Sequence, residues 1–318
     1  MTGGRTAERL AAAKQPMLLG LHTDCYLEMG PKPGPWYLER AEHAGLQGVQ
    51  FAADRLGARD YSSLFVLRAR AEERSLYIEL AARTADLAEL GDVVRAAHLM
   101  GCGVVSVSVG DGRPADPDEF EAQLREAAAS LREVAALAKR YDIWLAVENH
   151  RDMTSGELLR FIAAIDQDCV GVCLDTGNPL AVLEDPVAAA SALAPVALTV
   201  HLKDYQVVPT ETGVRLVSCP LGEGVVDFRQ VFTIIQANNP TVRLNIQTNG
   251  REVDLPCLQG EFLGSLTDRR PEHLASILRL SRARPSEPAS DTQPDVAVRK
   301  SAELARQILG HRSLPLEL

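Results

Sequence analysis

The chain of 318 residues is acidic, with a formal net charge of −10 and a pI near 5.3. Because this charge repels phosphates and no Lys/Arg cluster interrupts it, we do not expect nucleic acid as a partner. Apolar residues make up 46% and charged residues 24%, which is typical of a soluble globular protein and excludes a disordered chain. With no apolar run of 18 residues and no apolar leader, no membrane segment is expected.

The cysteines indicate a reducing compartment. Six are present, none in a CxxC pair and most among apolar neighbours: Cys25, Cys102, Cys169, Cys173, Cys219 and Cys257. Such a distribution is typical of a cytoplasmic protein with free thiols.

Short apolar segments alternate with longer segments of helical period along most of the chain. The expected strands are 17–21, 48–52, 75–80, 104–109, 144–148, 171–175, 197–202 and 243–248; the expected helices include 37–44, 86–99, 117–141, 155–166, 186–194 and 228–237. Eight such repeats predict a (β/α)₈ barrel as one catalytic domain over residues 15–280. The alternative is an open doubly wound sheet, but no GxGxxG follows the first strand.

The last 38 residues differ in composition from the barrel. Residues 281–299 are rich in Pro, Ser and acidic side chains, which predicts a flexible linker. Residues 300–318 form the expected helical tail, with an amphipathic pattern over 300–309. Docking of this tail on the barrel or on a partner subunit and fraying into solvent are all compatible with the sequence.

The carboxyl ends of the last four expected strands carry polar side chains, where a barrel places its active site. Glu148, Asp175, His201 and Gln247 share the inward parity of their strands. Singly, such residues are more often helix caps or surface groups, but four at matching positions predict one divalent metal site. This donor set suits Mn²⁺, Co²⁺, Zn²⁺ or Fe²⁺ and would tolerate Mg²⁺.

Further candidates surround this ring. Lys203 has the parity of His201 and is expected to support an oxyanion, unless it only pairs with Asp204 or Glu223. Asp204 is expected to do no more than hold that lysine.

His150 is a candidate proton carrier, or else a solvent-facing histidine at a loop end. His22 and Glu79, at the expected ends of the first and third strands, are candidates for binding substrate hydroxyls. The segment 205–223 is expected to form a loop over the barrel mouth. Gly222 in this segment and Gly224 directly after it could offer N–H groups to an anion.

Five segments in order carry a family resemblance: LAVENH, GVCLDTGNPL, LTVHLKDY, PLGEGVVDF and LNIQTNGREVDLP. They resemble the xylose-isomerase-like TIM-barrel superfamily, in particular the sugar phosphate isomerase/epimerase family, over about residues 17–280. The resemblance implies that Glu148, Asp175 and His201 bind one divalent metal, often Mn²⁺. The chain departs at Gln247, where the family usually has Glu, and at Asn178, a candidate substrate-binding residue where many members have His.

These departures bear on the chemistry. A neutral carboxamide can ligate a metal but cannot act as a base, whereas epimerases of this family resemble two-base enzymes. We therefore expect an isomerase or epimerase of a sugar or sugar-like polyol, with Glu148, His150 and Lys203 as catalytic residues and a metal-stabilised enediolate. The runner-up is a lyase that dehydrates a keto-sugar or an inosose-like substrate.

Two further functional classes share this fold. One is a non-catalytic barrel with a weakened metal site. The other, an abasic-site endonuclease, is disfavoured because that branch resembles a three-zinc site and the chain has only seven histidines. A small carbohydrate-like substrate is the expected partner, and assembly into homo-oligomers is left open.

Overall fold

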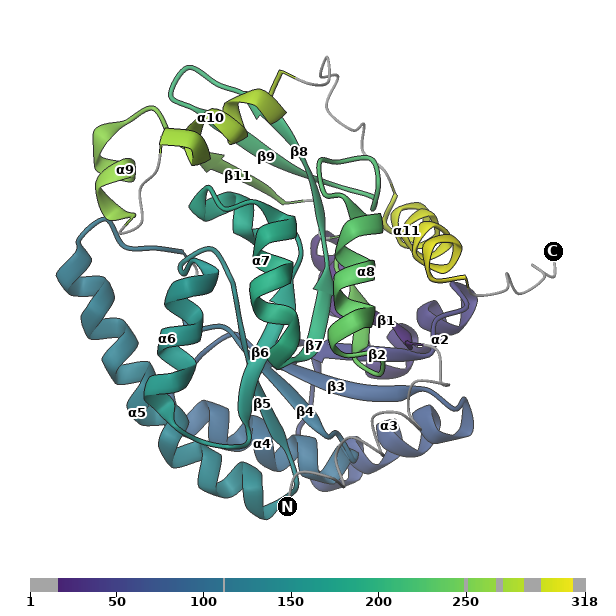
Figure 1. Cartoon of the computed structure of the whole chain (residues 1–318). Coiled ribbons are helices and arrows are strands. Elements are labelled where there is room, and N and C mark those ends of the chain that lie inside the picture. The colour runs from purple at the N-terminus through teal and green to yellow at the C-terminus, as the bar shows by residue number, and fades with distance from the viewer. Residues whose placement is uncertain (1–16, 111, 249–250, 267–270, 283–292, 311–318) are drawn as a thin grey trace.

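The computed structural model describes residues 17–110, 112–248, 251–266, 271–282 and 293–310. Eight parallel strands close into a barrel with helices around it, which confirms the predicted fold (Figure 1). The strand order around the barrel is β1-β10-β7-β6-β5-β4-β3-β2. The strands are β1 (Leu19–His22), β2 (Gly48–Ala52), β3 (Tyr77–Ala82), β4 (Val104–Val107), β5 (Trp144–Glu148), β6 (Val170–Asp175), β7 (Ala197–Leu202) and β10 (Arg243–Ile246).

The helices pack apolar faces against the strands, and this interface holds the main core. They are η1 (Thr23–Met29), α2 (Gly34–His43), η2 (Ala53–Arg55), α3 (Tyr61–Glu73), α4 (Leu87–Met100), α5 (Pro117–Arg140), α6 (Ser155–Ile165), η3 (Asn178–Val182), α7 (Pro186–Leu193), η4 (Ala194–Val196), α8 (Phe228–Asn238), α9 (Gly260–Ser265), α10 (Pro271–Leu280) and α11 (Pro294–Leu309). All six helices expected from the sequence are present. Helix α3 was not among them, since its exposed Phe65 and Val66 blur the apolar face.

The barrel register brings the polar strand ends together. Asp175 pairs with His201 across β6 and β7, and His201 pairs with Asn245 across β7 and β10. Gln247 follows the end of β10 directly, and its N–H donates to the carbonyl of Leu202 at 2.9 Å. Parallel strands that end at the same edge therefore place these side chains in one mouth.

A second, antiparallel sheet stands at one end of the barrel, in the order β11-β9-β8 (Figure 1). Its strands are β8 (Asp204–Pro209), β9 (Val214–Cys219) and β11 (Glu252–Leu255). The expectation of a loop over 205–223 was therefore wrong for most of that segment. Alternate residues of β8 and β9, such as Tyr205, Val207 and Leu216, are buried in a second hydrophobic cluster with residues of α10, which stabilises the hairpin.

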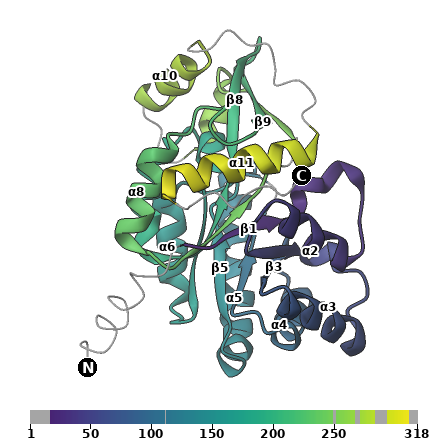
Figure 2. The same ribbon diagram turned by 90° about the vertical axis from the view of Figure 1, so that its right-hand side faces the viewer.

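The C-terminal helix docks on the barrel rather than fraying. Helix α11 lies beside α8 and η1 (Figure 2) and buries Val298, Ala302 and Ala305. The Ser301 hydroxyl oxygen accepts the N–H of Leu221 at 3.1 Å. The helix begins at Pro294, so the expected boundary between linker and tail falls inside it; residues 283–292 and 311–318 lie outside the described residues.

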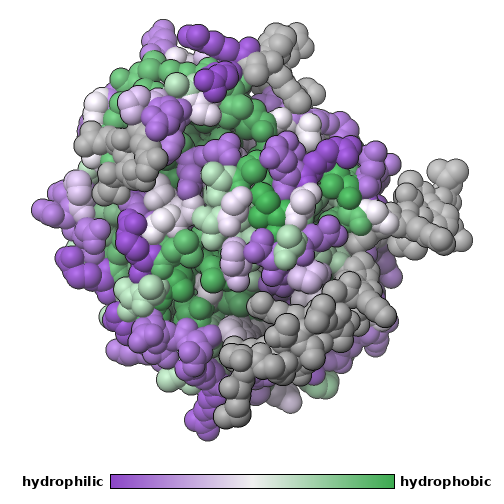
Figure 3. Space-filling view, viewed as in Figure 1, coloured by the Kyte–Doolittle hydropathy of each residue, from purple (hydrophilic) through white to green (hydrophobic). Residues whose placement is uncertain are grey.

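The outer surface mixes hydrophilic and hydrophobic residues over the face seen in Figure 3. Within the described part of the chain, every helix is too short or too polar to cross a bilayer.

Candidate metal and substrate site

Three ligand-type side chains meet at the ends of neighbouring strands. Glu148 ends β5, Asp175 ends β6 and His201 lies near the end of β7, and one ligand atom from each lies within 4.8 Å of the others. All three side chains are buried. Two carboxylates and an imidazole in such a cluster form a donor set that could hold a divalent ion.

The ring of His201 is oriented by a residue of the second strand. Its Nε2 lies 2.6 Å from Oε1 of Gln50, while Nδ1 lies 3.2 Å from Oε1 of Glu148. Because the amide nitrogen of Gln50 donates to Glu79 at 3.2 Å, the Gln50 oxygen is left to accept the Nε2–H. In the neutral ring the lone pair of Nδ1 then faces the carboxylates, as a metal ligand requires, whereas in the protonated ring Nδ1–H donates to Glu148.

Glu79 lies below the mouth rather than in it, so its expected position was wrong. The third strand begins two residues later than expected, which makes Glu79 its third residue instead of a strand end. The fully buried carboxylate accepts hydrogen bonds from Thr199 Oγ1 at 2.8 Å and Asn245 Nδ2 at 3.0 Å, as well as from Gln50. Glu79 therefore supports the ring through Gln50 and does not line the pocket.

Gln247 points into the same mouth and has one oxygen without a partner. Its Nε2 donates to Oδ2 of Asp24 at 3.4 Å, whereas its buried Oε1 has no hydrogen-bond partner among the described residues. Buried carboxamide oxygens normally accept a hydrogen bond, so an unpartnered one beside three ligand-type residues fits a fourth oxygen donor. The residues present thus fit a single divalent ion.

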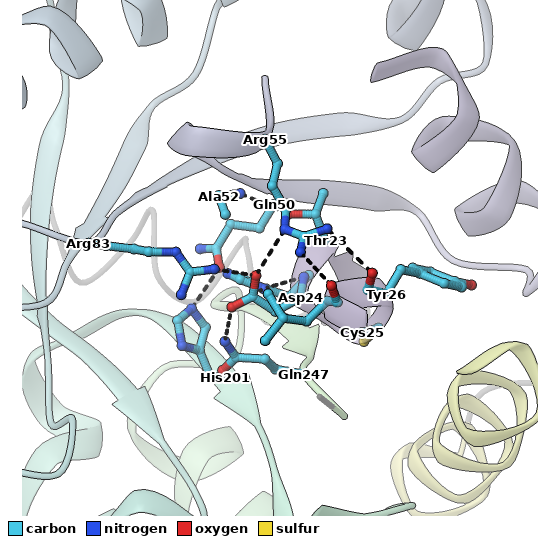
Figure 4. Close-up of polar contacts among 12 residues, drawn as sticks. Thr23, Asp24, Cys25, Tyr26, Gln50, Ala52, Arg55, Arg83, His201 and Gln247 are labelled. Atoms are coloured by element: carbon cyan, nitrogen blue, oxygen red, sulfur yellow. Dashed lines mark hydrogen bonds and ion pairs between the residues drawn. The ribbon is translucent and has the colours of Figure 1, made fainter. Parts of the chain in front are cut away.

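Asp24 organises the opposite wall of the mouth (Figure 4). Its Oδ1 accepts from Nη2 of Arg83 and lies 3.7 Å from Nε of Arg55. Burial alone would raise the pKa of Asp24, but the charges of His22, Arg83 and Arg55 outweigh it and lower that pKa. The ionised carboxylate of Asp24 accepts a hydrogen bond from the amide nitrogen of Gln247, so the amide oxygen of Gln247 points away from Asp24. Neither Asp24 nor Arg83 was identified from the sequence; the signal that could have found Asp24 is its place directly after the first strand.

Lys203 pairs with a candidate ligand of the ring. Its Nζ lies 2.8 Å from Oδ2 of Asp175 and donates to Oδ1 of Asn178 at 3.2 Å. Asn178 in turn donates from Nδ2 to Oε1 of Glu148 at 3.1 Å. Burial alone would lower the pKa of Lys203, but the charge of Asp175 outweighs it and raises that pKa. The buried lysine is thus a fixed cation at the edge of the ring.

Asp204 serves a different purpose from the one expected. Its carboxylate accepts four backbone N–H groups, from Tyr205, Gly222, Gly224 and Val226, at 2.8 to 3.1 Å. Asp204 thus turns to backbone N–H groups, whereas Lys203 turns to Asp175. The anion held by the glycine N–H groups is therefore this carboxylate, which fastens the segment after β9.

Both candidate histidines line the pocket. Nδ1 of His150 lies 2.8 Å from the carbonyl oxygen of Gly110. Because a carbonyl oxygen only accepts hydrogen bonds, Nδ1 carries the proton, and Nε2 is the ring nitrogen that can serve a ligand. The ring of His22 meets that of His201 edge-on, with centroids 5.1 Å apart. Glu148, Asn178, His201, Lys203 and Gln247 also line this pocket.

Comparison with known proteins agrees with the barrel fold. The sequence model of the xylose isomerase-like TIM barrel family matches residues 38–263. The chain belongs to this family. The family resemblance seen in the sequence is thereby confirmed.

Individual known proteins resemble the chain to different extents. A 3-oxo-isoapionate decarboxylase from Pectobacterium atrosepticum is 31% identical over 119 residues, which cover 37% of this chain and 43% of that protein. The match thus spans less than half the length of this curated relative.

Solved structures support the fold. A D-psicose 3-epimerase from Clostridium cellulolyticum H10, solved with D-tagatose, has a TM-score of 0.66 at 14% identity, and the alignment covers 92% of this chain and 99% of that one. A xylose isomerase-like protein from Mycobacterium smegmatis, solved with magnesium, has a TM-score of 0.60 at 18% identity, covering 85% of this chain and 98% of that one.

We expect His22 to make the stability of this family member depend on pH. Burial is the main cause that lowers the pKa of His22 from its usual 6.5 to about 3, against the opposing charge of Asp24, and Nδ1 accepts the N–H of Asp24 at 3.0 Å. Below pH 6.5 His22 therefore binds a proton in the unfolded chain but not in the folded chain. The free energy of unfolding thus decreases as the pH falls from 6.5 toward 3. Between pH 7.5 and pH 5 we expect a loss of about 2 kcal/mol from this group.

Urea unfolding at both pH values, in EDTA, measures this loss. His22→Asn keeps an acceptor for the Asp24 N–H but cannot be protonated, so its free energy of unfolding should change less with pH than that of the wild type. Equal pH dependence in the two proteins would contradict the assignment.

Proposed function

We propose that the protein is a divalent-metal-dependent isomerase or epimerase of a sugar or sugar-like polyol. It would remove a proton from a carbon next to a carbonyl group to give an enediolate. The observation that supports this most is the buried cluster of Glu148, Asp175 and His201 with the unpartnered oxygen of Gln247 beside it. The epimerase with a similar fold and the magnesium complex are consistent with it.

The metal would be held by Glu148, Asp175, His201 and Gln247, with Mn²⁺ or Mg²⁺ as suitable ions. When bound, it would polarise the substrate carbonyl and disperse the negative charge that develops on its oxygen. The ammonium group of Lys203, fixed by Asp175, would add a second positive charge at the same edge.

Glu148 is the proposed base. Its Oε1 contacts His201 and Asn178, and its Oε2 accepts the Ser108 hydroxyl at 2.9 Å, so the carboxylate is held in one orientation. Burial alone would raise the pKa of Glu148, but the charge and hydrogen bond of His201, with the charges of His150 and Lys203, hold it well below its usual value. An ionised, fixed carboxylate can accept a proton from a substrate carbon. His150, on the pocket wall, would pass a proton between substrate oxygens, and His22 and Asn178 would bind hydroxyls.

Gln247 limits this chemistry to one face of the substrate. A carboxamide takes up no proton near neutral pH, so the position opposite Glu148 offers no second base. Isomerisation between aldose and ketose, which needs proton transfer on one face only, is therefore favoured over two-base epimerisation.

A lyase is the second candidate, and the decarboxylase relative favours it. Loss of water or of CO₂ beside a carbonyl group passes through the same enediolate or enolate. Loss of water takes one proton from carbon and gives one to the departing hydroxyl group, whereas loss of CO₂ requires only that a proton be added to carbon. Neither reaction needs a second base on the opposite face of the substrate, so both fit a site with one base.

Two measurements test the proposal. The first is the metal content of the purified protein and the binding of added Mn²⁺ by calorimetry. The second is incubation of D-fructose, D-tagatose and a 3-oxo sugar acid in D₂O, followed by mass spectrometry. Deuterium on the carbon next to the carbonyl indicates an isomerase or epimerase, and release of CO₂ or water indicates the lyase. If no Mn²⁺ binds even when it is supplied in large excess, the metal-dependent function is refuted.

Gln247→Glu should tighten Mn²⁺ binding roughly 10–100-fold, because a charged oxygen donor replaces a neutral one. Without metal the same variant should be less stable than the wild type, since the new carboxylate faces Asp24 in place of a donor 3.4 Å away. Calorimetry and unfolding with and without Mn²⁺ measure both effects. Gln236→Glu, on the exposed side of α8, adds the same charge and should change neither. Unchanged affinity in Gln247→Glu would exclude Gln247 from the metal site.

A further inference from the structure

The mouth of the barrel is positively charged although the whole chain has a net charge of −10. Four cationic side chains line the pocket, Arg83, Arg151, Lys203 and Arg251, against two lining carboxylates, Asp24 and Glu148, and the Asp175 carboxylate of the ligand cluster. A pocket with the opposite sign to the protein attracts anions and focuses them at its mouth. A divalent ion on the ligand cluster would strengthen this field further.

Most of these cations already have partners. Lys203 is paired with Asp175 at 2.8 Å, Arg83 is paired with Asp24 and also with Asp54 at 3.3 Å, and Arg251 has an interaction of its own. Arg151 differs, because its guanidinium makes no hydrogen bond or ion pair with another residue that the structure describes. A partly buried guanidinium in this state keeps its donors available for a ligand.

Arg151 stands between two cavities. Besides the pocket with the ligand cluster, it lines a neighbouring cavity of about 160 Å³, and Val253 is also shared by both. The other charged residues of that second cavity are satisfied by ion pairs: Arg113 with Glu157 at 2.8 Å and Asp254 with Arg215 at 2.6 Å. A ligand that extends from the cluster into the second cavity would therefore pass the guanidinium of Arg151.

We propose that Arg151 binds an anionic group of the substrate, so that the substrate is a sugar acid or a sugar phosphate rather than a neutral sugar. This rests on the proposed function, since it names the substrate class of the same site. The planar guanidinium can donate two parallel N–H bonds to the oxygens of a carboxylate or of a phosphate. The anionic end would lie at the junction of the cavities, and the carbonyl end would reach Glu148.

Calorimetric titration of the full-length protein in EDTA tests this without turnover. The probes are glucitol, gluconate and glucitol 6-phosphate, which share one carbon chain and differ in a terminal hydroxyl, carboxylate or phosphate. The wild type should bind at least one anionic probe about tenfold or more tightly than glucitol, as expected for a charge-assisted pair of hydrogen bonds. The better of the two anions identifies the source of the charge.

Arg151→Gln should reduce that preference to about onefold, and Arg151→Lys should retain only part of it, because an ammonium group cannot make the paired bonds. The matched control is Arg95→Gln on the exposed side of α4, where Arg95 pairs with Asp92 at 2.7 Å. This variant should keep the full preference. Circular dichroism checks that each variant is folded.

The proposal is overturned if the wild type shows no preference up to the solubility of the probes, or if both Arg151 variants keep it in full. These results are separate from those for the proposed function. Loss of preference in Arg151→Gln together with absent Mn²⁺ binding would keep the anion site and reject the metal-dependent reaction. Mn²⁺ binding and deuterium exchange without any preference for the anionic probes would keep the metal-dependent reaction and reject the anion site.

Discussion

Glu148→Gln should lower the rate of deuterium incorporation into substrate about 10²–10⁴-fold, because the proposed base is replaced by an amide of the same shape. It should also weaken Mn²⁺ binding, since one of two charged ligands becomes neutral. Oε1 of Glu148 contacts Asn178 and His201, and Oε2 accepts the Ser108 hydroxyl. An amide has one oxygen in place of two, so it can keep only part of this set. Mass spectrometry of substrate incubated in D₂O, at saturating Mn²⁺, measures the exchange.

The matched control is Glu126→Gln on the exposed side of α5, which removes the same charge far from the mouth and should leave exchange unchanged. Exchange at the wild-type rate in Glu148→Gln, with metal bound, would assign the base to another residue. His150 would then be the first alternative, since it lines the same pocket.

Asp175→Asn should reduce the free energy of unfolding by about 3 kcal/mol in EDTA, because it leaves Lys203 as a buried cation without a charged partner. The substitution keeps an oxygen for the N–H groups of Gly177 and Asn178, both 2.8 Å from Oδ1, so the loss reports mainly the ion pair. Lys203→Met should be destabilising for the converse reason. Urea unfolding of the metal-free protein measures both losses.

The double variant Asp175→Asn, Lys203→Met should be more stable than the sum of the single losses predicts, since it leaves no unpaired charge. EDTA is essential here, because metal binding to the folded state would add its own stabilisation. Additive losses would show that the two side chains do not interact as the 2.8 Å separation indicates.

Most of the barrel could be predicted because its signals are local. Each strand is a short apolar segment and each helix has its own period and cap, such as Thr154 with Glu157 at the start of α6. Three strands, β2, β5 and β7, have the predicted bounds. The hairpin β8–β9 was missed, because its alternating residues become buried only when α10, some sixty residues later, packs over them.

The site was predictable in part for the same reason. Strand parity and position at a strand end bring Glu148, Asp175 and His201 together once the barrel closes. Glu79 was misplaced because a shift of two residues in the strand bounds keeps the inward parity but changes the depth. Parity therefore gives the face of a strand, and only the register gives the height along the barrel axis.

The sequence by itself determined which residue types stand at the strand ends, and with them the fold and the candidate ligands, because both follow from patterns within about thirty residues. Only the tertiary structure decided which atoms meet. Gln247 takes its orientation from Asp24, which lies 223 residues away in the chain, and Lys203 pairs with Asp175 while its neighbour Asp204 turns to the backbone of another segment. Hydrogen-bond partners are set by proximity across the closed barrel, and no local pattern records that proximity.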